Sequence, residues 1–305
     1  MRVYKGHGTE NDFVVIPDLD GVIRVTPELV RALCDRHAGI GADGVLRVVR
    51  SENDRDAHHL AAEAPFFMDY RNADGSIAEM CGNGVRVFMR YLQGASLVGQ
   101  DAAVATRGGI MRVQAARDAC VTVNMSQPRI LADRPVATAA LHDPSALDDP
   151  AALIDHAVPT GTARAFSAAG ASVEMPNPHV VVEVRSRAEL ECLDLSRPPD
   201  VRPPLPHGQN VEFVLREGTR HLAMRVHERG VGETRSCGTG ICAVVAAIAT
   251  EDGTGADGAP WRVDVPGGTC TVVWRTDGDI ELTGPAVIVA AIDIDEAWLA
   301  AVAAD

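Results

Sequence analysis

Two short segments of this 305-residue chain are nearly identical, and each contains a cysteine. Residues 80–84 read MCGNG around Cys81, and residues 236–240 read SCGTG around Cys237. An apolar, helix-like stretch follows each segment. A thiol just before a helix meets unpaired backbone N–H groups and the positive end of the helix dipole, which favours the thiolate. Two matched cysteines therefore predict a site that acts on its substrate from both sides.

Facing each other across a cleft, two such cysteines could invert a stereocentre. One thiolate would remove a proton from a carbon acid, and the other cysteine, as a thiol, would protonate the opposite face. This chemistry needs a site from which water is excluded. Backbone N–H groups at the helix starts would bind a substrate carboxylate and stabilise enolate-like charge. These groups belong to Gly82, Asn83, Gly238 and Thr239.

A single Cys-Gly-x-Gly segment is more often a buried structural cysteine before a turn. Two such segments, each preceded by polar residues, favour the functional interpretation. The chain has seven cysteines but no Cys-x-x-Cys, which argues against a zinc knuckle or a thioredoxin-like site. An odd count without a secretion signal favours reduced thiols. We interpret the remaining five as structural: Cys34, Cys120, Cys192, Cys242 and Cys270.

The composition argues against several classes of protein. The chain has 28 basic and 42 acidic residues, a net charge of −14, and only 4% aromatic residues. It therefore lacks the basic surface and the stacking residues of a nucleic-acid binder. No apolar run reaches eighteen residues and the start does not resemble a signal peptide, so we predict no membrane span and a cytoplasmic location. Residues 39–44 (GIGADG) precede a strand instead of following one, which argues against a dinucleotide site.

Strands separated by Gly, Pro and Asp turns dominate the predicted secondary structure, so we expect an α+β fold. Strands are predicted at 12–16, 44–49, 104–106, 109–114, 120–125, 179–184, 211–215, 222–227, 262–265, 269–274 and 280–282. Helices are predicted at 27–34, with Thr26 as N-cap, and after each paired cysteine. Residues 51–64 and 139–157 are predicted to be exposed helical or loop insertions. Residues 197–206, with five prolines, are predicted to be a rigid connector.

A faint internal repeat indicates two equivalent halves. Asn11 leads into an apolar strand and lies 70 residues before Cys81. Asn177 also leads into an apolar strand and lies 60 residues before Cys237. We place the boundary between the halves near residues 126–128.

The ordered series of motifs resembles the diaminopimelate epimerase family over almost the whole chain. Members of this family interconvert LL- and meso-diaminopimelate without pyridoxal phosphate. The segments that match are 5–13 (KGHGTENDF), 39–44, 71–76 (RNADGS), 80–86 (MCGNGVR), 177–179 (NPH), Asn210, 228–230 (ERG) and 236–240. Among the departures from the family, many members carry Gln where this chain has Gly44, so that substrate contact is not carried over. Gly6, Thr9 and Glu10 also replace residues that are common in the family.

The resemblance implies two pseudo-symmetric halves of mixed, mainly antiparallel sheet, each wrapped on a central helix. Residues 1–127 would form the half that carries Cys81, with 287–305 returning to it, and 128–286 the half that carries Cys237. It also implies a cytoplasmic homodimer that uses no cofactor or metal. This enzyme would serve the synthesis of lysine and peptidoglycan precursors, and its partner would be the small-molecule substrate, not a nucleic acid or a membrane.

The resemblance also assigns roles to residues. Cys81 and Cys237 would be the acid/base pair, with Cys81 as proton donor and Cys237 as acceptor in the LL-to-meso direction. His179 would lie close to the chemistry. Gly82, Asn83, Gly238 and Thr239 would hold the reacting end of the substrate. Substrate recognition, largely of its distal ammonium and carboxylate, would fall to Asn11, Asn72, Asn177, Asn210, Glu228 and Arg229.

Three other functions remain open at this point. A proline or hydroxyproline racemase would share the two-cysteine chemistry and the fold, but it has no need of Glu228 and Arg229 for a distal charged end. A phenazine-biosynthesis-type isomerase would share the fold but lack the paired cysteines. A dithiol redox protein would use the same cysteines as a disulfide. Taken singly, each asparagine is more often a turn residue, and Glu228 with Arg229 a surface ion pair.

Overall fold

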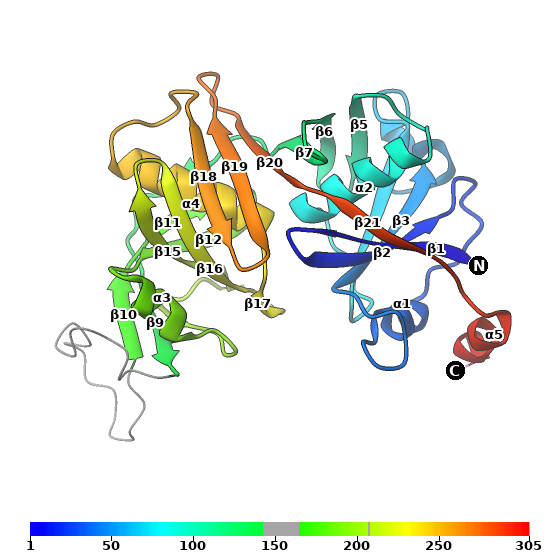
Figure 1. The fold of residues 1–305 in the computed structure, drawn as a ribbon, viewed down its shortest axis with the longest axis horizontal. Coiled ribbons are helices and arrows are strands. Elements are labelled where there is room, and N and C mark those ends of the chain that lie inside the picture. The colour runs from blue at the N-terminus through cyan, green and yellow to red at the C-terminus, as the bar shows by residue number, and fades with distance from the viewer. Residues whose placement is uncertain (143–164, 207, 305) are drawn as a thin grey trace. The chain divides into compact units, whose positions relative to one another are not determined.

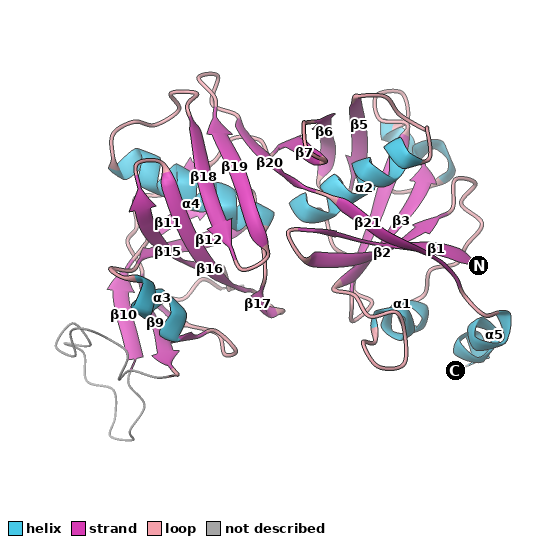
Figure 2. Cartoon of the chain, in the orientation of Figure 1, coloured by secondary structure: helices cyan, strands magenta, loops and turns pink. Residues whose placement is uncertain are grey.

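The computed structural model describes residues 1–142, 165–206 and 208–304. The chain divides into two compact units, Met1–Asn124 with Thr283–Asp305, and Met125–Leu282. For comparison, the sequence predicts a first half that ends at residue 127 and resumes at 287. Strands far outnumber helices in both units, so the α+β prediction is confirmed (Figure 2). None of the described helices is both long enough and apolar enough to cross a bilayer.

In the first unit, the sheet surrounds one helix. The strands pair in the order β21-β1-β2-β3-β4-β5-β6-β7, with β2/β3 and β4/β5 parallel and the other pairs antiparallel. Helix α2 packs against strands from both ends of this order, so the sheet must curve around it (Figure 1). The bounds are β1 Arg2–Gly8, β2 Asn11–Pro17, β3 Gly44–Arg50, β4 Phe66–Asn72, α2 Gly82–Gly94, β5 Asp101–Thr106, β6 Gly109–Ala115, β7 Cys120–Asn124 and β21 Val287–Asp293.

Helix α1 (Pro27–Cys34) has the predicted bounds and cap. Thr26 accepts a hydrogen bond from the Leu29 N–H at 3.2 Å, and Pro27 occupies the first turn, where its missing N–H has no cost. The buried face of α1 includes Val30 and Leu33. Helix α5 (Glu296–Ala304), which the sequence did not predict, packs against α1.

The second unit repeats this arrangement. Its strands pair in the order β8-β11-β12-β15-β16-β18-β19-β20, with β17 also on β16; β12/β15 and β16/β18 are parallel. Helix α4 packs against β11, β12, β15 and β19. The bounds are β8 Arg129–Ile130, β11 Ala171–Glu174, β12 Pro178–Glu183, β15 Asn210–Gly218, β16 His221–Glu228, β17 Gly232–Thr234, α4 Gly238–Glu251, β18 Pro260–Val265, β19 Gly268–Trp274 and β20 Ile280–Pro285.

A smaller sheet completes the second unit. Strand β9 pairs antiparallel with β10, β13 and β14, and helix α3 packs on β15. The core beneath this sheet includes Phe166 and Phe213, whose rings meet edge to face at 5.9 Å. The bounds are β9 Val136–Leu141, β10 Ala165–Ala169, α3 Arg187–Cys192, β13 Leu193–Asp194 and β14 Asp200–Arg202.

The two units are topological repeats. The parallel pairs β2/β3 and β4/β5 of the first correspond to β12/β15 and β16/β18 of the second. Helix α2 lies in the connection from β4 to β5, and α4 lies in the connection from β16 to β18. Asn11 begins β2, while Asn177 immediately precedes β12. The faint repeat seen in the sequence is therefore a repeat of the whole fold.

Each predicted strand is present close to its predicted bounds. Residues 51–64 form η1 (Ser51–Asn53) and η2 (His58–Leu60), and many of them are exposed, as predicted, although Ala57 and Ala64 are 0% exposed. Residues 139–157 begin within strand β9, and those from 143 onward lie outside the described residues. The connector 197–206 contains strand β14, which pairs with β9.

The buried position of Ala57 within this segment can be tested directly. Ala57 packs with Val49, Phe67 and Ala105, so Ala57→Asp should place a carboxylate in an apolar cluster. We expect the free energy of unfolding to fall by about 2 kcal/mol or more. The matched control is Ala62→Asp, whose site is exposed and which should cost under about 0.5 kcal/mol. Equal urea midpoints for the two variants would contradict the buried packing.

Candidate active site

Each of the two paired cysteines is the N-cap of a helix. Cys81 has extended backbone angles (φ −144°, ψ 117°), and its Sγ accepts a hydrogen bond from the Gly84 N–H at 3.4 Å. Cys237 has nearly the same angles (φ −123°, ψ 112°), and its Sγ accepts from the Gly240 N–H, also at 3.4 Å. The repeated sequence therefore gives the same local structure in both units. In each helix, the first N–H groups lack a partner within the helix, as an anion-binding helix start requires.

In the first unit, Cys81 is half-buried beside two predicted substrate residues. Its thiol donates to the Asn11 side-chain oxygen at 3.7 Å, and Asn83 donates to the same oxygen at 3.2 Å. The Asn11 amide nitrogen donates to Asp43 at 2.7 Å. Arg86 donates to the Asn83 side-chain oxygen at 2.8 Å. The sequence analysis did not identify Asp43 and Arg86 as site residues. Their hydrogen bonds to Asn11 and Asn83 join residues that only the fold brings together.

The predicted residue Asn72 lies at the end of β4, opposite Gly44 on β3. Its amide donates to the Ser76 hydroxyl at 3.0 Å. A Cβ atom at Gly44 would lie 2.6 Å from the Arg71 carbonyl oxygen and 2.9 Å from a ring carbon of Tyr70. The space that a larger side chain at position 44 would enter is therefore filled in this chain, and Gly44 contributes no side-chain contact.

In the second unit, Cys237 is almost fully buried, with 4% exposure. Burial, together with the negative charges of Glu228 and Glu212, raises the pKa of its thiol well above the ordinary value. Hydrogen bonds involving the Thr239 hydroxyl and the Gly240 N–H oppose this shift without cancelling it. The helix start acts in the predicted direction at Cys237, but burial and the two carboxylates raise the pKa of the thiol more than the helix start lowers it.

Glu228 lies at the end of β16 and accepts a hydrogen bond from the Thr234 hydroxyl. Burial raises the pKa of its carboxyl group, and hydrogen bonds with Thr234 and Cys237 act in the opposite direction. A carboxylate held in this way is suited to pair with a substrate ammonium group.

A buried His–Glu pair lies beneath the first turn of α4. The imidazole Nδ1 of His179 lies 2.6 Å from a Glu212 carboxyl oxygen, and both side chains are 0% exposed. The other ring nitrogen lies 3.0 Å from the side-chain oxygen of Asn177. A Cβ atom at Gly240 would lie 2.6 Å from the same Glu212 oxygen, which explains the glycine at that position. Glu212 was missed because its strand otherwise reads as apolar core.

Asn210 and Arg229 lie at the adjoining strand ends. The Asn210 side-chain oxygen accepts from the Arg229 backbone N–H at 2.9 Å, and Asn210 is the parallel-register neighbour of His179. The Arg229 side chain is exposed and borders a cavity of about 390 Å³ that is also lined by Gln209 and His227. The guanidinium is thus placed where a carboxylate can reach it.

Two equivalent strand positions beneath the helix starts carry apolar side chains in the first unit and ionisable side chains in the second. Phe13 and Leu46 each lie two residues after the start of β2 and β3, as His179 and Glu212 lie two residues after Asn177 and Asn210. A Cβ atom at Gly84 would lie 3.2 Å from Leu46 and 3.6 Å from the Phe13 ring. The surface beneath the Cys81 helix start is therefore apolar, whereas the equivalent surface beneath the Cys237 helix start carries an ionisable pair.

The predicted site residues thus form two groups, one in each unit. The first contains Asn11, Asn72, Cys81, Gly82 and Asn83, and the second contains Asn177, His179, Asn210, Glu228, Arg229, Cys237, Gly238 and Thr239. Within the described parts of the chain, no cluster of three or more His, Cys, Asp or Glu residues is arranged to hold a metal ion.

The comparisons with known proteins agree with this arrangement. The family model for diaminopimelate epimerase matches residues 3–131 and 171–289. The chain belongs to the diaminopimelate epimerase family. It is 51% identical to the diaminopimelate epimerase of Streptomyces coelicolor, with 98% of this chain and 97% of that protein covered. It is 49% identical to the diaminopimelate epimerase of Thermobifida fusca, with 96% and 98% covered.

Solved structures show the same fold at low sequence identity. A phenazine biosynthesis protein of the PhzF family from Bacillus anthracis is 16% identical, with a TM-score of 0.66 and coverage of 97% of this chain and 99% of that one. A probable proline racemase from Agrobacterium radiobacter is 14% identical, with a TM-score of 0.65 and coverage of 97% and 93%. At these identities the likeness concerns the fold alone. It confirms the two-half architecture expected of a diaminopimelate epimerase family member.

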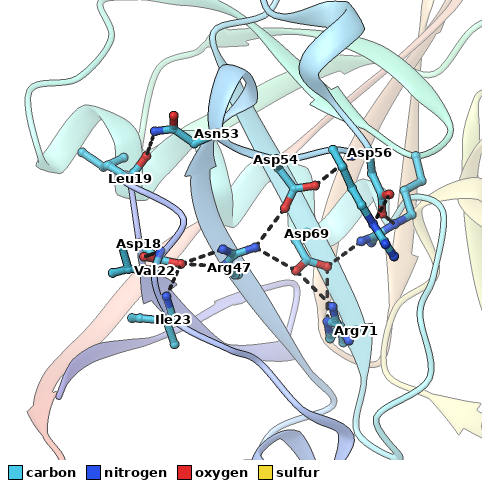
Figure 3. Close-up of polar contacts among 12 residues, drawn as sticks. Asp18, Leu19, Val22, Ile23, Arg47, Asn53, Asp54, Asp56, Asp69 and Arg71 are labelled. Carbon is cyan, nitrogen blue, oxygen red and sulfur yellow. Dashed lines mark hydrogen bonds and ion pairs between the residues drawn. The ribbon is translucent and has the colours of Figure 1, made fainter.

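A buried ion network holds residues 51–64 against the strands of the first unit (Figure 3). At its centre, Asp69 on β4 is 1% exposed and contacts Arg47 at 3.6 Å, Arg71 at 3.3 Å and Arg107 at 2.9 Å. Arg47 also pairs with Asp18 at 2.7 Å, and Arg47 pairs with Asp54 at 3.0 Å. Arg107 pairs with Asp56 at 2.9 Å. The carboxylates of residues 54 and 56 thus attach this segment to the network.

The network continues to the segment that precedes Cys81. Arg107 lies in the β5–β6 turn, where the Gly108 N–H donates to the Glu79 carbonyl at 3.1 Å. A Cβ atom at Gly108 would lie 3.3 Å from Met80. Asp69 therefore supports, through one arginine, the turn against which the Cys81 segment rests.

Because Asp69 neutralises three arginines away from solvent, its removal should be costly. We expect Asp69→Asn to lower the free energy of unfolding by about 3 kcal/mol, since uncompensated buried charges remain. Asp56→Asn, at a more exposed end of the same network, should cost under about 1 kcal/mol. Urea unfolding of both variants measures the difference, and equal losses would mean that Asp69 is not the centre of the network.

Proposed function

We propose that this protein interconverts LL- and meso-diaminopimelate, with Cys81 and Cys237 as a two-base pair and without a cofactor. The observation that carries this proposal is the repeated N-cap geometry: two thiols with equivalent capping bonds start equivalent helices in the two units. Membership of the family supports the substrate. We further propose that the protein is a cytoplasmic homodimer that serves lysine and peptidoglycan-precursor synthesis.

The proposed reaction transfers one proton at each face of an α-carbon. In the LL-to-meso direction, the Cys237 thiolate removes the α-proton and becomes a thiol, and the electron pair moves onto the substrate carboxylate. The Cys81 thiol then donates its proton to the opposite face and becomes a thiolate. After one turnover, the two sulfur atoms have exchanged protonation states. The reverse reaction begins from that exchanged form.

The negative charge that develops on the substrate carboxylate needs preorganised donors. The helix-start N–H groups of Gly82, Asn83, Gly238 and Thr239 are proposed to supply them. Glycine after each cysteine lets the backbone approach the ligand without a Cβ atom in the way. Each helix contributes the positive end of its dipole to the same carboxylate.

Polar side chains are proposed to bind the distal end of the substrate. Glu228 would bind an ammonium group and Arg229 a carboxylate, with the amides of Asn72, Asn177 and Asn210 beside them. These groups support diaminopimelate over proline, which has no second charged end. The likeness to a probable proline racemase extends only to the fold.

Substrate binding is also proposed to activate Cys237. Among the charged groups that raise the pKa of the Cys237 thiol, Glu228 has the largest effect. An ammonium group paired with Glu228 would cancel this charge and so lower the pKa of the thiol. Cys237 would then release its proton to water as the substrate binds, and would keep it in the free enzyme.

We expect Cys81→Ala and Cys237→Ala each to lower the epimerisation rate by a thousandfold or more, since each removes one of the two proton-transfer groups. The measurement is proton exchange at the α-carbon in heavy water, with LL-diaminopimelate, meso-diaminopimelate and proline offered separately. The wild-type protein should exchange the two diaminopimelate isomers and leave proline unchanged.

Cys120→Ala is the matched control, because it removes a thiol of strand β7 that caps no helix. It should retain wild-type exchange. Full activity in either paired-cysteine variant would contradict the two-base mechanism, and exchange with proline alone would overturn the substrate.

A further inference from the structure

Four side chains of the first unit are joined by hydrogen bonds in a series, called here the hydrogen-bond chain, which passes beside Cys81. Arg86 donates to the Asn83 oxygen at 2.8 Å, and the Asn83 nitrogen donates to the Asn11 oxygen at 3.2 Å. The Asn11 nitrogen then donates to Asp43 at 2.7 Å. The Cys81 thiol donates to the Asn11 oxygen at 3.7 Å, so the sulfur joins the chain at its middle.

The two ends of this chain fix the direction of both amides. A guanidinium can only donate hydrogen bonds, so Arg86 requires the oxygen of Asn83 and turns the Asn83 nitrogen toward Asn11. A carboxylate can only accept, so Asp43 requires the nitrogen of Asn11 and turns the Asn11 oxygen back toward Asn83 and Cys81. Reversal of either amide would place two donors or two acceptors against each other.

Burial makes this direction costly to change. Arg86 is fully buried, and Asn83 and Asn11 are buried with it. A buried polar group that loses its partner costs roughly 1–3 kcal/mol, so a reversed amide has no low-energy alternative. The Thr9 hydroxyl, which accepts from Arg86 at 2.9 Å, holds the guanidinium in the same place.

The charge of Asp43 is compensated on its outer side. Arg36 donates to Asp43 at 2.8 Å and to Asp12 at 2.9 Å, and Lys5 pairs with Asp12 at 2.6 Å. Burial alone would raise the pKa of Asp12, but the hydrogen bonds and charges of Arg36 and Lys5 lower it to about 2. The Asp43 end of the hydrogen-bond chain therefore belongs to a stable ion group of two acidic and two basic residues.

We propose that Arg86 and Asp43, neither of which needs to touch substrate, are positioning residues that turn the Asn11 oxygen toward Cys81 and so hold Cys81 in its thiol form. A carbonyl oxygen accepts from S–H but repels a thiolate. The Asn11 oxygen therefore opposes the helix start, which favours the thiolate at the same sulfur. Cys81 is thus prepared as a proton donor.

This inference rests on the proposed function only for the role of the Cys81 thiol as a proton donor. A donor at Cys81 matches its assigned part in the LL-to-meso direction. The state of the sulfur itself can be measured without any turnover, so the two proposals can fail separately. Absence of α-proton exchange when the wild-type protein is given diaminopimelate would overturn the proposed function, whereas the alkylation results described below would overturn only the present inference.

The wild-type protein gives the first test. The alkylation rate of Cys81 by iodoacetamide, followed by mass spectrometry of the peptide that contains it, is proportional to the thiolate fraction. A cysteine held as a thiol should react about tenfold faster for each pH unit between pH 6.5 and 7.5. A rate that does not change over this range would mean that Cys81 is already a thiolate, and the proposal would be overturned without any variant.

The second test is Asp43→Asn. An amide at position 43 can donate as well as accept, so it no longer requires the Asn11 nitrogen. Asn11 can then reverse and offer its nitrogen to the sulfur, at the cost of the single hydrogen bond from Asn83. We expect alkylation of Cys81 at pH 7 to become about tenfold faster, as for the change of one hydrogen bond to a charged group. An unchanged rate in a folded Asp43→Asn protein would contradict the proposal.

Asp12→Asn is the matched control. It removes the same charge from the same ion group, but the Asp12 side chain contacts Lys5, Arg36 and the Asp43 backbone N–H, not the Asn11 amide. Its alkylation rate should stay within about twofold of wild type. Equal acceleration in the two variants would assign the effect to charge alone and overturn the part played by amide direction. Urea unfolding of both variants verifies that each is folded.

Discussion

The hydrogen bond from a helix N–H to each cysteine sulfur is the interaction on which the rest of the structure depends. It ties each sulfur, proposed as a proton-transfer atom, to the backbone of a buried helix start, so the position of the sulfur follows that of the helix. The sheet of each unit surrounds that helix, and the strand ends beside the cap carry the asparagines and acids. Positioning by packed strands is stiffer than positioning by loops, as proton transfer over short distances requires.

The two cysteines have equivalent helix caps, but their surroundings differ. A helix start favours a nearby anion by about 0.3–1 kcal/mol, and by up to about 2 kcal/mol in buried sites. Removing a charged group from water costs several kcal/mol, and adjacent carboxylates add to that cost. At Cys237 burial and the two glutamates therefore exceed the helix effect, and the pKa of the thiol rises. The helix start lowers the cost of a thiolate without producing one in the free protein.

The differences between the two units lie in the residues beneath the caps. Phe13 and Leu46 leave the surface beneath the Cys81 helix start apolar, while His179 and Glu212 provide an ionisable pair beneath the Cys237 helix start. A repeated fold would by itself give two interchangeable cysteines. A reaction that needs one donor and one acceptor benefits from substitutions that keep the backbone repeat and change only its side-chain environment.

Much of the fold and of the site could be predicted from the sequence, because both depend on local chemistry. Alternating apolar residues between turn residues indicate the strands, Thr26 and Pro27 indicate the start of α1, and two Cys-Gly-x-Gly segments indicate the paired caps. These signals arise within a few residues of one another. They were sufficient for the fold class, the internal repeat, the two cysteines and the family.

Other features depended on contacts between residues far apart in the chain. Asp43 and Arg86 gained their importance only when the fold placed them against Asn11 and Asn83. The ion pairs of Asp54 and Asp56 could not be predicted from residues 51–64 alone, because the arginines that bind these carboxylates lie on other elements. The sequence by itself determined which atoms could do the chemistry. The tertiary structure decided the surroundings of each sulfur, such as the burial and the carboxylates that raise the pKa of Cys237, because these arise from packing across the whole unit.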